Sequence, residues 1–525
     1  MKCLFVSARS CTVLVDENGD YFAGVSRAFM LNGESVSDEQ LRMRAGEECS
    51  VISLFSLWPD TEYTLASYIN CEKEAEITFR TEKEVCSLNV RRFGAKGDGA
   101  HDDTAAIQAA ILSCPAGGRV LIPKGDYLTG PLFLKSHITI EMKRDAALYL
   151  KTDREQFPVL PGMTRTTDEE GEVLLGSWEG NPLDSFASFI TGIGVEDVKI
   201  IGPGVLDGNG PKGDWWVNPK IKKIAYRPRM LYLRDCRDIT VQGITVRNSP
   251  AWNLHPTFSE NLSFLNMRIE APANSPNTDG FDPESCKHVR MYGAMFSVGD
   301  DCIAIKAGKI YMGMKYHVPC EDIEIAWCCM LDGHGGVTVG SEMAGGVKNV
   351  RVHHCCMVHN DRGLRIKTRR GRGKYAVIDG IVFDHVRMAG VRCPLVVNAM
   401  YFCDPDGRTE YVQSREKQPV DDTTPTIGSI RFEQVDAENC EACAGYILGL
   451  PERPVKEILM KDCRFTFNPD GKPIAPAMAA NVEQCLGQGI IASYVDKLSM
   501  DNVTMEGISG ERIEATEVKM IDDRS

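Results

Sequence analysis

The chain has 525 residues, of which 43% are hydrophobic and 25% are charged, and its formal net charge is −14. This composition is typical of a globular protein, but the length exceeds what one ordinary core organises unless the fold is repetitive. The acidic balance argues against nucleic acid or an anionic membrane surface. We therefore expect neither as a partner. The sequence leaves the oligomeric state open.

Residues 1–85 predict a small β-sandwich domain. The apolar run within residues 1–15 is broken by Ser7 and Arg9 and precedes no small-residue cleavage site, so we interpret it as a first β-strand and not as a signal peptide. Residues 57–69 and 74–83 alternate apolar and polar positions, as half-buried antiparallel strands do. Their Leu-x-Pro-x-Thr-x-Tyr and Thr-Phe-Arg-Thr patterns resemble a fibronectin type III domain.

The chain has 20 cysteines, which could form disulfide bonds or remain as thiols. Many lie within apolar strand patterns, and no export signal is visible, so we expect reduced thiols in a cytoplasmic protein. Cys440 and Cys443 form a lone Cys-x-x-Cys pair without a second pair at zinc-like spacing. We interpret the pair as packing and expect no metal and no cofactor.

Residues 86–525 predict a parallel β-helix, an all-β solenoid. After one expected helix over Asp103–Ser113, similar units of short alternating strands begin near nine positions along the chain. Units of this length without long helical periodicity are typical of stacked β-coils, and Cys328-Cys329 and Cys355-Cys356 occupy the same place in successive units. The units begin near Asp238, Asn261, His288, Asp322, Asn349, Gly380, Ser429, Glu457 and Lys497.

Short acids recur in phase with these coils. Asp279, the pair Asp300–Asp301, His334 and Arg365 follow one another at about one coil each. Residues one coil apart lie on neighbouring rungs about 4.8 Å apart, so we expect them to converge. Carboxylates that share a site must differ in pKa, and an acid beside a carboxylate is what glycosidic cleavage requires. A bend at Gly299 would let both acids of the pair face the site.

Seven cations without an acid follow between Asp361 and Asp379. A charge run is usually a solvated face, but in an acidic chain it also predicts a clamp for carboxylates. Arg365 and Lys367 are two residues apart, so on a strand they point the same way. The seven cations are Arg362, Arg365, Lys367, Arg369, Arg370, Arg372 and Lys374, and further candidates for substrate contact are Arg227, Arg229, His255, Asn277 and Lys306.

Each of these features has a structural alternative when taken alone. An Asp-Gly pair is usually a turn, an Asp-Asp pair a solvated loop, and a Gly-His-Gly stretch a turn. Four motifs in order nevertheless resemble glycoside hydrolase family 28, the polygalacturonases. These motifs are Asn-Thr-Asp-Gly (277–280), Gly-Asp-Asp-Cys (299–302), Gly-His-Gly (333–335) and Arg-Ile-Lys (365–367), and residues 94–111 resemble the entry segment of pectin-active β-helix proteins.

The resemblance implies a right-handed parallel β-helix and an inverting hydrolase. Asp300 is expected to protonate the leaving oxygen, and Asp279 and Asp301 to activate the water. His334 is expected to support the acid. Arg365, Lys367 and Tyr401 are expected to contact galacturonate, although a core aromatic is an alternative for Tyr401. Inversion predicts acid and base carboxyls roughly 6.5–9.5 Å apart.

The predicted substrate is an oligogalacturonide or another acidic pectin fragment, cleaved at α-1,4-galacturonosyl linkages. Expected loops at 151–194, around Trp215–Trp216 and at 402–428 could close one end of the site, which favours exo-action from the non-reducing end. Three alternatives remain at this point: a hydrolase of rhamnogalacturonan or another substituted pectin, an eliminase similar to pectate lyase, and a non-catalytic β-helical glycan-binding protein.

Overall fold

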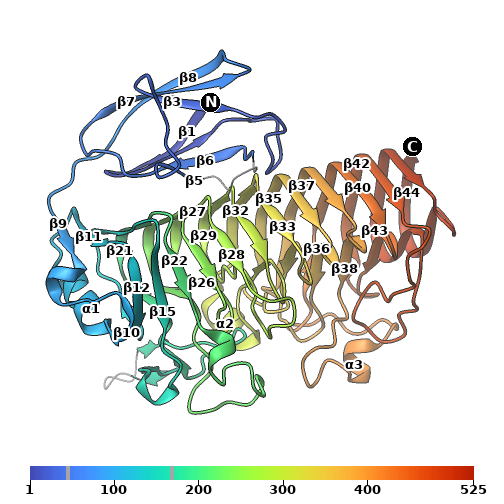
Figure 1. Cartoon of the computed structure of the whole chain (residues 1–525). Helices are drawn as coiled ribbons and strands as arrows, with labels where there is room; N and C mark the ends of the chain where they lie inside the picture. Colours follow the sequence, from blue (N-terminus) through green and yellow to red (C-terminus); the bar gives the residue numbers. More distant parts are fainter. Residues whose placement is uncertain (43–47, 166–170) are drawn as a thin grey trace.

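The computed structural model describes residues 1–42, 48–165 and 171–525. It shows a right-handed parallel β-helix with a small two-sheet domain beside it (Figure 1). The fold class predicted from the repeats is therefore confirmed. No helix in the described parts of the chain is both long and apolar enough to cross a membrane.

The small domain consists of two antiparallel four-stranded sheets with a core between them that includes Val13, Phe29, Ile52 and Leu65. The expected strand within residues 1–15 is a pair of strands, β1 and β2. One sheet has the order β1 (Lys2–Val6), β2 (Cys11–Leu14), β6 (Val51–Leu54), β5 (Leu41–Arg42), and the other β4 (Glu34–Ser35), β3 (Ala28–Leu31), β7 (Glu62–Ile69), β8 (Glu72–Arg80). The fibronectin type III assignment of this domain stays a prediction.

The solenoid has three faces of parallel strands, which we call the first, second and third face. The first face contains β9 (Ser87–Asn89), β11 (Gly118–Ile122), β14 (Ile138–Met142), β21 (Glu196–Ile201), β24 (Arg237–Gln242), β27 (Glu260–Leu265), β29 (Lys287–Tyr292) and β32 (Cys320–Ala326). It continues into the long strands β35 (Val347–Val358), β37 (Val377–Ala389), β40 (Ser429–Cys440), β42 (Val455–Phe467), β43 (Gln488–Glu506) and β44 (Ile513–Arg524), with β39 (Thr426–Ile427) beside β37.

The second and third faces complete each coil. The second face contains β10 (Asp98–Asp102), β12 (Gly125–Thr129), β15 (Ala146–Leu150), β22 (Val205–Asp207), β25 (Thr245–Arg247), β28 (Arg268–Glu270), β30 (Met295–Ser297) and β33 (Cys329–Leu331). The third face contains β13 (Leu132–Phe133), β20 (Ile190–Ile193), β23 (Leu231–Arg234), β26 (Leu254–Thr257), β31 (Ile303–Ile305), β34 (Val337–Val339), β36 (Arg362–Lys367), β38 (Cys393–Asn398) and β41 (Cys443–Leu448).

The polar residues that mark the sequence units have a common backbone conformation. Asp238, Asn261, His288, Asp322 and Asn349 each lie at the start of a first-face strand with φ between 52° and 58°. Asn, Asp and His tolerate this left-handed region better than other side chains that carry a Cβ. The repeated polar residue therefore turns the chain into each new coil. The predicted cysteine ladder is also present, because Cys329 pairs in register with Cys356.

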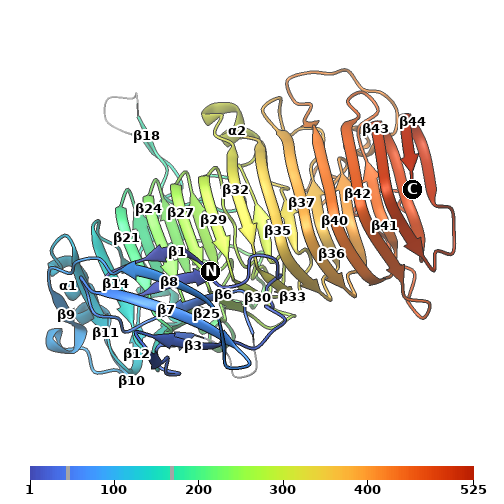
Figure 2. The ribbon, with the colours of Figure 1, turned by 90° about the horizontal axis from the view of Figure 1, so that it is seen from above.

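The small domain packs closely on the solenoid where the first face turns into the second (Figure 2). Gly243 and Gly293 have positive φ, and a Cβ on them would lie 2.3 Å from Phe55 and 2.6 Å from Val51 respectively. Only glycine leaves room for these side chains. Gln242 adds a buried hydrogen bond to Thr12. The two parts therefore form a tight interface.

The connections carry the remaining elements. The expected helix over Asp103–Ser113 is α1 (Thr104–Ser113). Beyond it lie α2 (Ile310–Tyr316), α3 (Glu410–Gln413), three 3₁₀ turns (Val90–Phe93, Arg154–Gln156, Gly210–Lys212) and the short strands β16 (Val159–Leu160), β17 (Thr164–Arg165), β18 (Glu172–Val173) and β19 (Ser185–Phe186). The segments with α2 and α3 lie on the side of the solenoid opposite the small domain (Figure 1).

Candidate active site

The acids predicted to converge lie on consecutive rungs at the start of the third-face strands. The Asn253 amide donates to the Asp279 carbonyl oxygen (2.8 Å), and the Gly280 amide donates to that of Asp301 (3.0 Å). The Cys302 amide in turn donates to the carbonyl oxygen of Gly335 (2.8 Å). These main-chain bonds bring segments that are distant in sequence to the same edge of the sheet.

Two glycines of the motifs make space for this edge. A Cβ on Gly299 would lie 2.4 Å from the Ser275 carbonyl oxygen, and one on Gly335 would lie 2.7 Å from Asp301 Oδ1. Neither contact is possible for a larger residue without displacement. Gly299 thus permits the tight turn that brings both acids of the Asp-Asp pair to the site, and Gly335 makes room for the Asp301 carboxylate.

The three carboxylates form a compact cluster. One oxygen from each of Asp279, Asp300 and Asp301 lies within 4.8 Å of the others. Asp279 and Asp301 are buried, whereas the Asp300 side chain is 25% exposed. Three oxygens at this spacing also suit a divalent cation, but two cations of the protein already hold Asp301.

Asp301 is held in the ionised form. Lys367 Nζ lies 2.8 Å from one of its oxygens and Arg365 Nη1 lies 3.1 Å from the other. Burial favours the neutral acid, but the two cations outweigh it and lower the pKa of Asp301. Arg365 and Lys367 therefore contact a site carboxylate as well as facing the site. Tyr401 lies beside them, with its ring 5.5 Å from Lys367 Nζ.

Asp279 is biased in the opposite direction. Burial and the neighbouring carboxylates of Asp300 and Asp282 raise its pKa well above the usual range. Its nearest cation, Lys306, lies 4.0 Å away and also lies 3.4 Å from Glu342. Asp279 and Asp301 thus share a site but favour different protonation states, as the sequence argument predicted for clustered acids.

Asp282 is a fourth carboxyl group, and the sequence analysis missed it. It is fully buried, neither oxygen has a hydrogen-bond partner, and Lys306 lies 3.4 Å from Oδ1. Burial raises its pKa to about 7. The sequence did contain a signal for it. Phe281 lies in the solenoid core, so the alternation of side chains along a strand predicts that Asp282 points away from the core.

His334 contacts Asp300, as predicted. Its Nδ1 lies 3.2 Å from Asp300 Oδ1, which also accepts the Asp301 amide at 2.9 Å. The hydrogen bond to Asp300 raises the pKa of His334. One oxygen of Asp300 is therefore fixed as an acceptor.

Several predicted substrate contacts are instead internal to the protein. His255 is fully buried and lies 2.9 Å from Glu284, and burial lowers its pKa to about 4. Lys306 is 3% exposed and its neighbours are acids of the protein. Asn277 is half-buried, and its side-chain oxygen accepts a hydrogen bond from Arg227 at 2.6 Å. We assign these side chains to holding the site and not to substrate contact.

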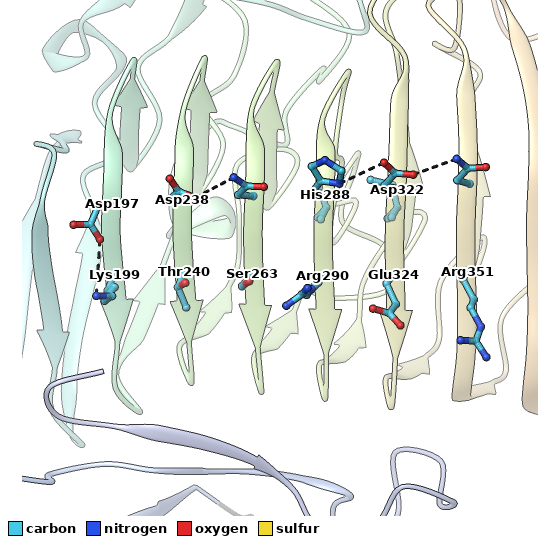
Figure 3. A pocket seen from close by; sticks show the side chains of 14 residues that line it. Asp197, Lys199, Asp238, Thr240, Ser263, His288, Arg290, Asp322, Glu324 and Arg351 are labelled. Atoms are coloured by element: carbon cyan, nitrogen blue, oxygen red, sulfur yellow. Dashed lines mark hydrogen bonds and ion pairs between the residues drawn. The ribbon is translucent and has the colours of Figure 1, made fainter. Parts of the chain in front are cut away.

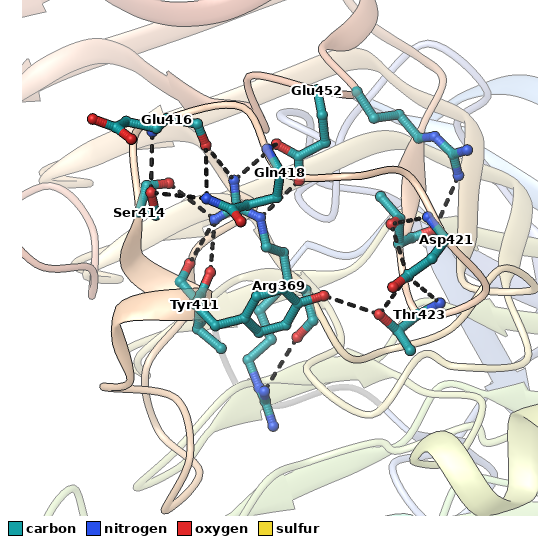
Figure 4. A network of polar contacts seen from close by, with 12 residues as sticks. Arg369, Tyr411, Ser414, Glu416, Gln418, Asp421, Thr423 and Glu452 are labelled. Atoms are coloured by element: carbon teal, nitrogen blue, oxygen red, sulfur yellow. Dashed lines mark hydrogen bonds and ion pairs between the residues drawn. The ribbon is translucent and has the colours of Figure 1, made fainter.

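Arg370 does not support the predicted role either. Its guanidinium is fully buried and forms two hydrogen bonds with Glu452, at 2.7 and 2.8 Å. It also donates to the carbonyl oxygens of Tyr411 and Ser414, within the polar network of Figure 4. Arg370 therefore fixes the segment that follows α3.

The prediction of one seven-cation clamp is wrong for most of the run. Arg362 donates to the carbonyl oxygens of Ala475 and Pro476. Arg369 and Arg372 pair with Asp404, and Lys374 pairs with Asp422. Carbonyl oxygens hold Arg362 and distant acids neutralise Arg369, Arg372 and Lys374. Of the run, Arg365 and Lys367 contact the acid cluster.

Stacked aromatic residues border the site on the N-terminal side. Trp178 stacks on Tyr226 (5.0 Å between ring centroids) and on Trp252 (5.7 Å) with nearly parallel planes. Lys306 Nζ lies 4.7 Å from the Trp252 ring. We call Trp178, Tyr226 and Trp252 the aromatic wall. Of the expected loops, 151–194 supplies Trp178, whereas Trp215 is fully buried.

Comparison with known proteins gives two family matches. The model of glycosyl hydrolases family 28 matches residues 115–485, which is more than half of the chain. A model of rhamnogalacturonase A/epimerase, pectate lyase-like, matches residues 87–141. The first match includes all four motifs of the site, and the second includes none of them.

Individual relatives agree with the larger match. A probable polygalacturonase of Vitis vinifera is 31% identical over 387 residues, covering 72% of this chain and 73% of the relative. An endo-polygalacturonase of Pectobacterium carotovorum subsp. carotovorum is 30% identical over 313 residues, covering 57% and 72%. The crystal structure of an exopolygalacturonase from Thermotoga maritima is 27% identical, with a TM-score of 0.65, and covers 80% of this chain and 92% of that one.

Proposed function

Because the chain belongs to glycosyl hydrolases family 28, we propose that it hydrolyses α-1,4-galacturonosyl linkages of galacturonan fragments with inversion, from the non-reducing end. The observation that carries this proposal is the cluster of Asp279, Asp300 and Asp301 with Arg365 and Lys367 beside it. The named relatives act on polygalacturonate, and a buried pair of cations suits a uronic acid better than a neutral sugar.

We assign the proton-transfer roles from the exposure and contacts of the three acids. Asp300 is the most exposed of the three and contacts His334 through one oxygen only, so it is the proposed general acid. Asp301 is held in the ionised form and can accept a proton from a water, while Asp279 favours the protonated form and can orient that water through a hydrogen bond. Lys306 holds Asp279 and Asp282 in place from the protein side.

The stereochemical outcome is open to a direct test. We propose inversion because the salt-bridged Asp301 and the proton-favouring Asp279 are poor nucleophiles. Proton NMR of the first product distinguishes the two: the β-anomer supports inversion, and the α-anomer overturns it.

Exo-action is proposed because the aromatic wall lies directly against the acids. Trp252 precedes Asn253, which is hydrogen-bonded to Asp279, so a chain bound along the rungs meets the wall beside the cluster. Chromatography of early products from polygalacturonate tests this proposal. Early release of only mono- or digalacturonate is expected, and a ladder of oligomers would show endo-action.

A second candidate is the hydrolysis of rhamnogalacturonan or another substituted pectin, which the match over residues 87–141 favours. Assays on polygalacturonate and rhamnogalacturonan in parallel separate the two. Ultraviolet absorbance of an unsaturated product would reveal an eliminase, and binding without turnover by the wild type would reveal a glycan-binding protein. A cytoplasmic location stays a proposal, which cell fractionation tests.

A further inference from the structure

The site is closed at a second end, on the C-terminal side, by a segment between β42 and β43. Arg362 donates to the carbonyl oxygens of Pro476 (2.7 Å) and Ala475 (2.8 Å). Asn398 donates to the carbonyl oxygen of Met478 (3.0 Å). These bonds fix the segment over β36 and β38, the third-face rungs that follow the acids. We call residues 475–480 the C-terminal wall.

A second loop supports this wall from behind. The Ala480 amide donates to Gln413 Oε1 (2.7 Å), and Arg415 Nη2 donates to the Ala480 carbonyl oxygen (3.0 Å). Both side chains belong to the segment around α3 (Glu410–Gln413), which the Arg370 network anchors. The C-terminal wall is thus held both to the solenoid and to another fixed loop. Its position does not depend on a single contact.

The wall reaches the site through Met478. Its sulfur accepts a hydrogen bond from Arg365 Nη2 at 3.2 Å, while Nη1 of the same guanidinium contacts Asp301. The thioether therefore stands next to the cation that is proposed to contact galacturonate. A sugar chain that continued along the rungs beyond Arg365 would meet Met478 and Pro476.

The two walls define the length of the site. Four rung spacings separate β26, which follows the aromatic wall, from β36, which carries Arg365. At ~4.8 Å per rung this distance is about 19 Å. Side-chain exposure rises from 2% at Asp301 to 25% at Asp300 and 53% at His334, so the site opens at His334.

We infer that the enzyme's substrates are short oligogalacturonides that enter at His334, and that polygalacturonate is a poor substrate because both ends of the site are walled. This inference rests on the proposed function, since it concerns the length of the same substrate. It also identifies Met478 as a residue that determines specificity for chain length.

The test is kcat/KM per non-reducing chain end for di-, tri- and hexagalacturonate and for polygalacturonate of known mean length. We expect trigalacturonate to exceed the polymer at least tenfold. Met478→Ala, which shortens the side chain beside Arg365, should reduce this ratio at least threefold. Met520→Ala on the exposed last strand is the matched control and should leave the ratio unchanged.

Equal values per chain end for trimer and polymer in the wild type would overturn the inference. An unchanged ratio in Met478→Ala would overturn the role of Met478. Calorimetry with the Asp300→Asn variant measures binding without turnover. It therefore tests the walled site independently of whether the proposed hydrolysis takes place. Tighter binding of trigalacturonate than of polymer chain ends supports the walled site even if no substrate is turned over, and equal binding contradicts it.

Discussion

Two faces of the same solenoid stack carboxylates on consecutive rungs, with opposite results. On the first face, an acid is followed by an amide side chain on the next rung at two places: Asn261 donates to Asp238 (3.0 Å) and Asn349 donates to Asp322 (3.2 Å), within the polar ladder of Figure 3. On the third face, Asp279, Asp300 and Asp301 are neighbours with no amide between them. In both cases the repeat places side chains of successive coils next to each other. The residue on the next rung decides whether an acid accepts a hydrogen bond from an amide or faces another carboxylate.

Burial sharpens this difference. Asp238 is exposed and Asp322 is partly exposed, so water screens both carboxylates and their pairs contribute little. On the third face Asp279 and Asp301 are buried. Burial and a like charge on the next rung raise the pKa of Asp279, while Lys367 and Arg365 lower that of Asp301. Perturbed acids of this kind mark functional sites.

Removal of the proposed general acid gives the largest expected difference between the faces. Asp300→Asn should lower kcat on trigalacturonate about 10²–10⁴-fold, because amide nitrogen cannot deliver the proton. Asp238→Asn on the first face is the matched control, and its kcat should stay within about twofold of the wild type. Steady-state assays measure both. Comparable losses in the two variants would mean that the acid cluster has no special role.

A second prediction separates the two kinds of cation in the run 362–374. Arg370→Met removes the partner of buried Glu452, which leaves a buried charge and should lower the free energy of unfolding by about 3–5 kcal/mol. KM should change little, because Arg370 does not contact the acid cluster. Urea denaturation and steady-state kinetics measure the two quantities. Arg365→Met is the contrast and should raise KM.

A third prediction concerns buried Asp282. Its pKa of about 7 lies above the value near 3.9 of an unfolded chain, so the folded state retains the proton and loses stability as the pH rises from about 4 to about 7. Asp282→Asn removes this dependence. Relative to the wild type, the variant should therefore gain about 1–3 kcal/mol between pH 4.5 and pH 7.

Urea denaturation at both pH values measures this change. A difference between variant and wild type that does not depend on pH would contradict the raised pKa of Asp282. Steady-state kinetics on trigalacturonate measure the effect of Asp282→Asn on activity separately. Asp282 contacts Lys306, which also lies near Asp279, so its effect on the reaction is indirect.

The coils and the acids could be predicted because both depend on spacing. Each coil adds one strand to the third face, so Asp279, Asp301 and His334 lie at one edge of that sheet regardless of the length of the loops between them. The polar residues at 238, 261, 288, 322 and 349 were visible as unit starts for a local reason, since each has a left-handed backbone. Periodicity therefore accounts for the scaffold and for the centre of the site.

The surroundings of the site could not be predicted because they are not periodic. The partners of Arg369, Arg370 and Arg372 are acids at 404 and 452, brought near by loops whose course has no repeat. The aromatic wall combines Trp178, Tyr226 and Trp252 from three separate segments. His255 and Arg370 are residue types that often bind ligands. Their burial could not be read from the sequence, because it depends on contacts with loops that have no repeat.

The smallest expected effect is on stability, when a pair of neighbouring carboxylates like that of the third face is created on the first face. Asn261→Asp keeps the shape and the left-handed backbone but places a second carboxylate beside Asp238. Because both positions are exposed, the loss of stability at pH 7 should be only about 0.5 kcal/mol. It should shrink in 1 M salt, where charges are screened within about 3 Å. A loss that persists in salt would show that the Asn261 amide bond, and not charge repulsion, stabilises the ladder.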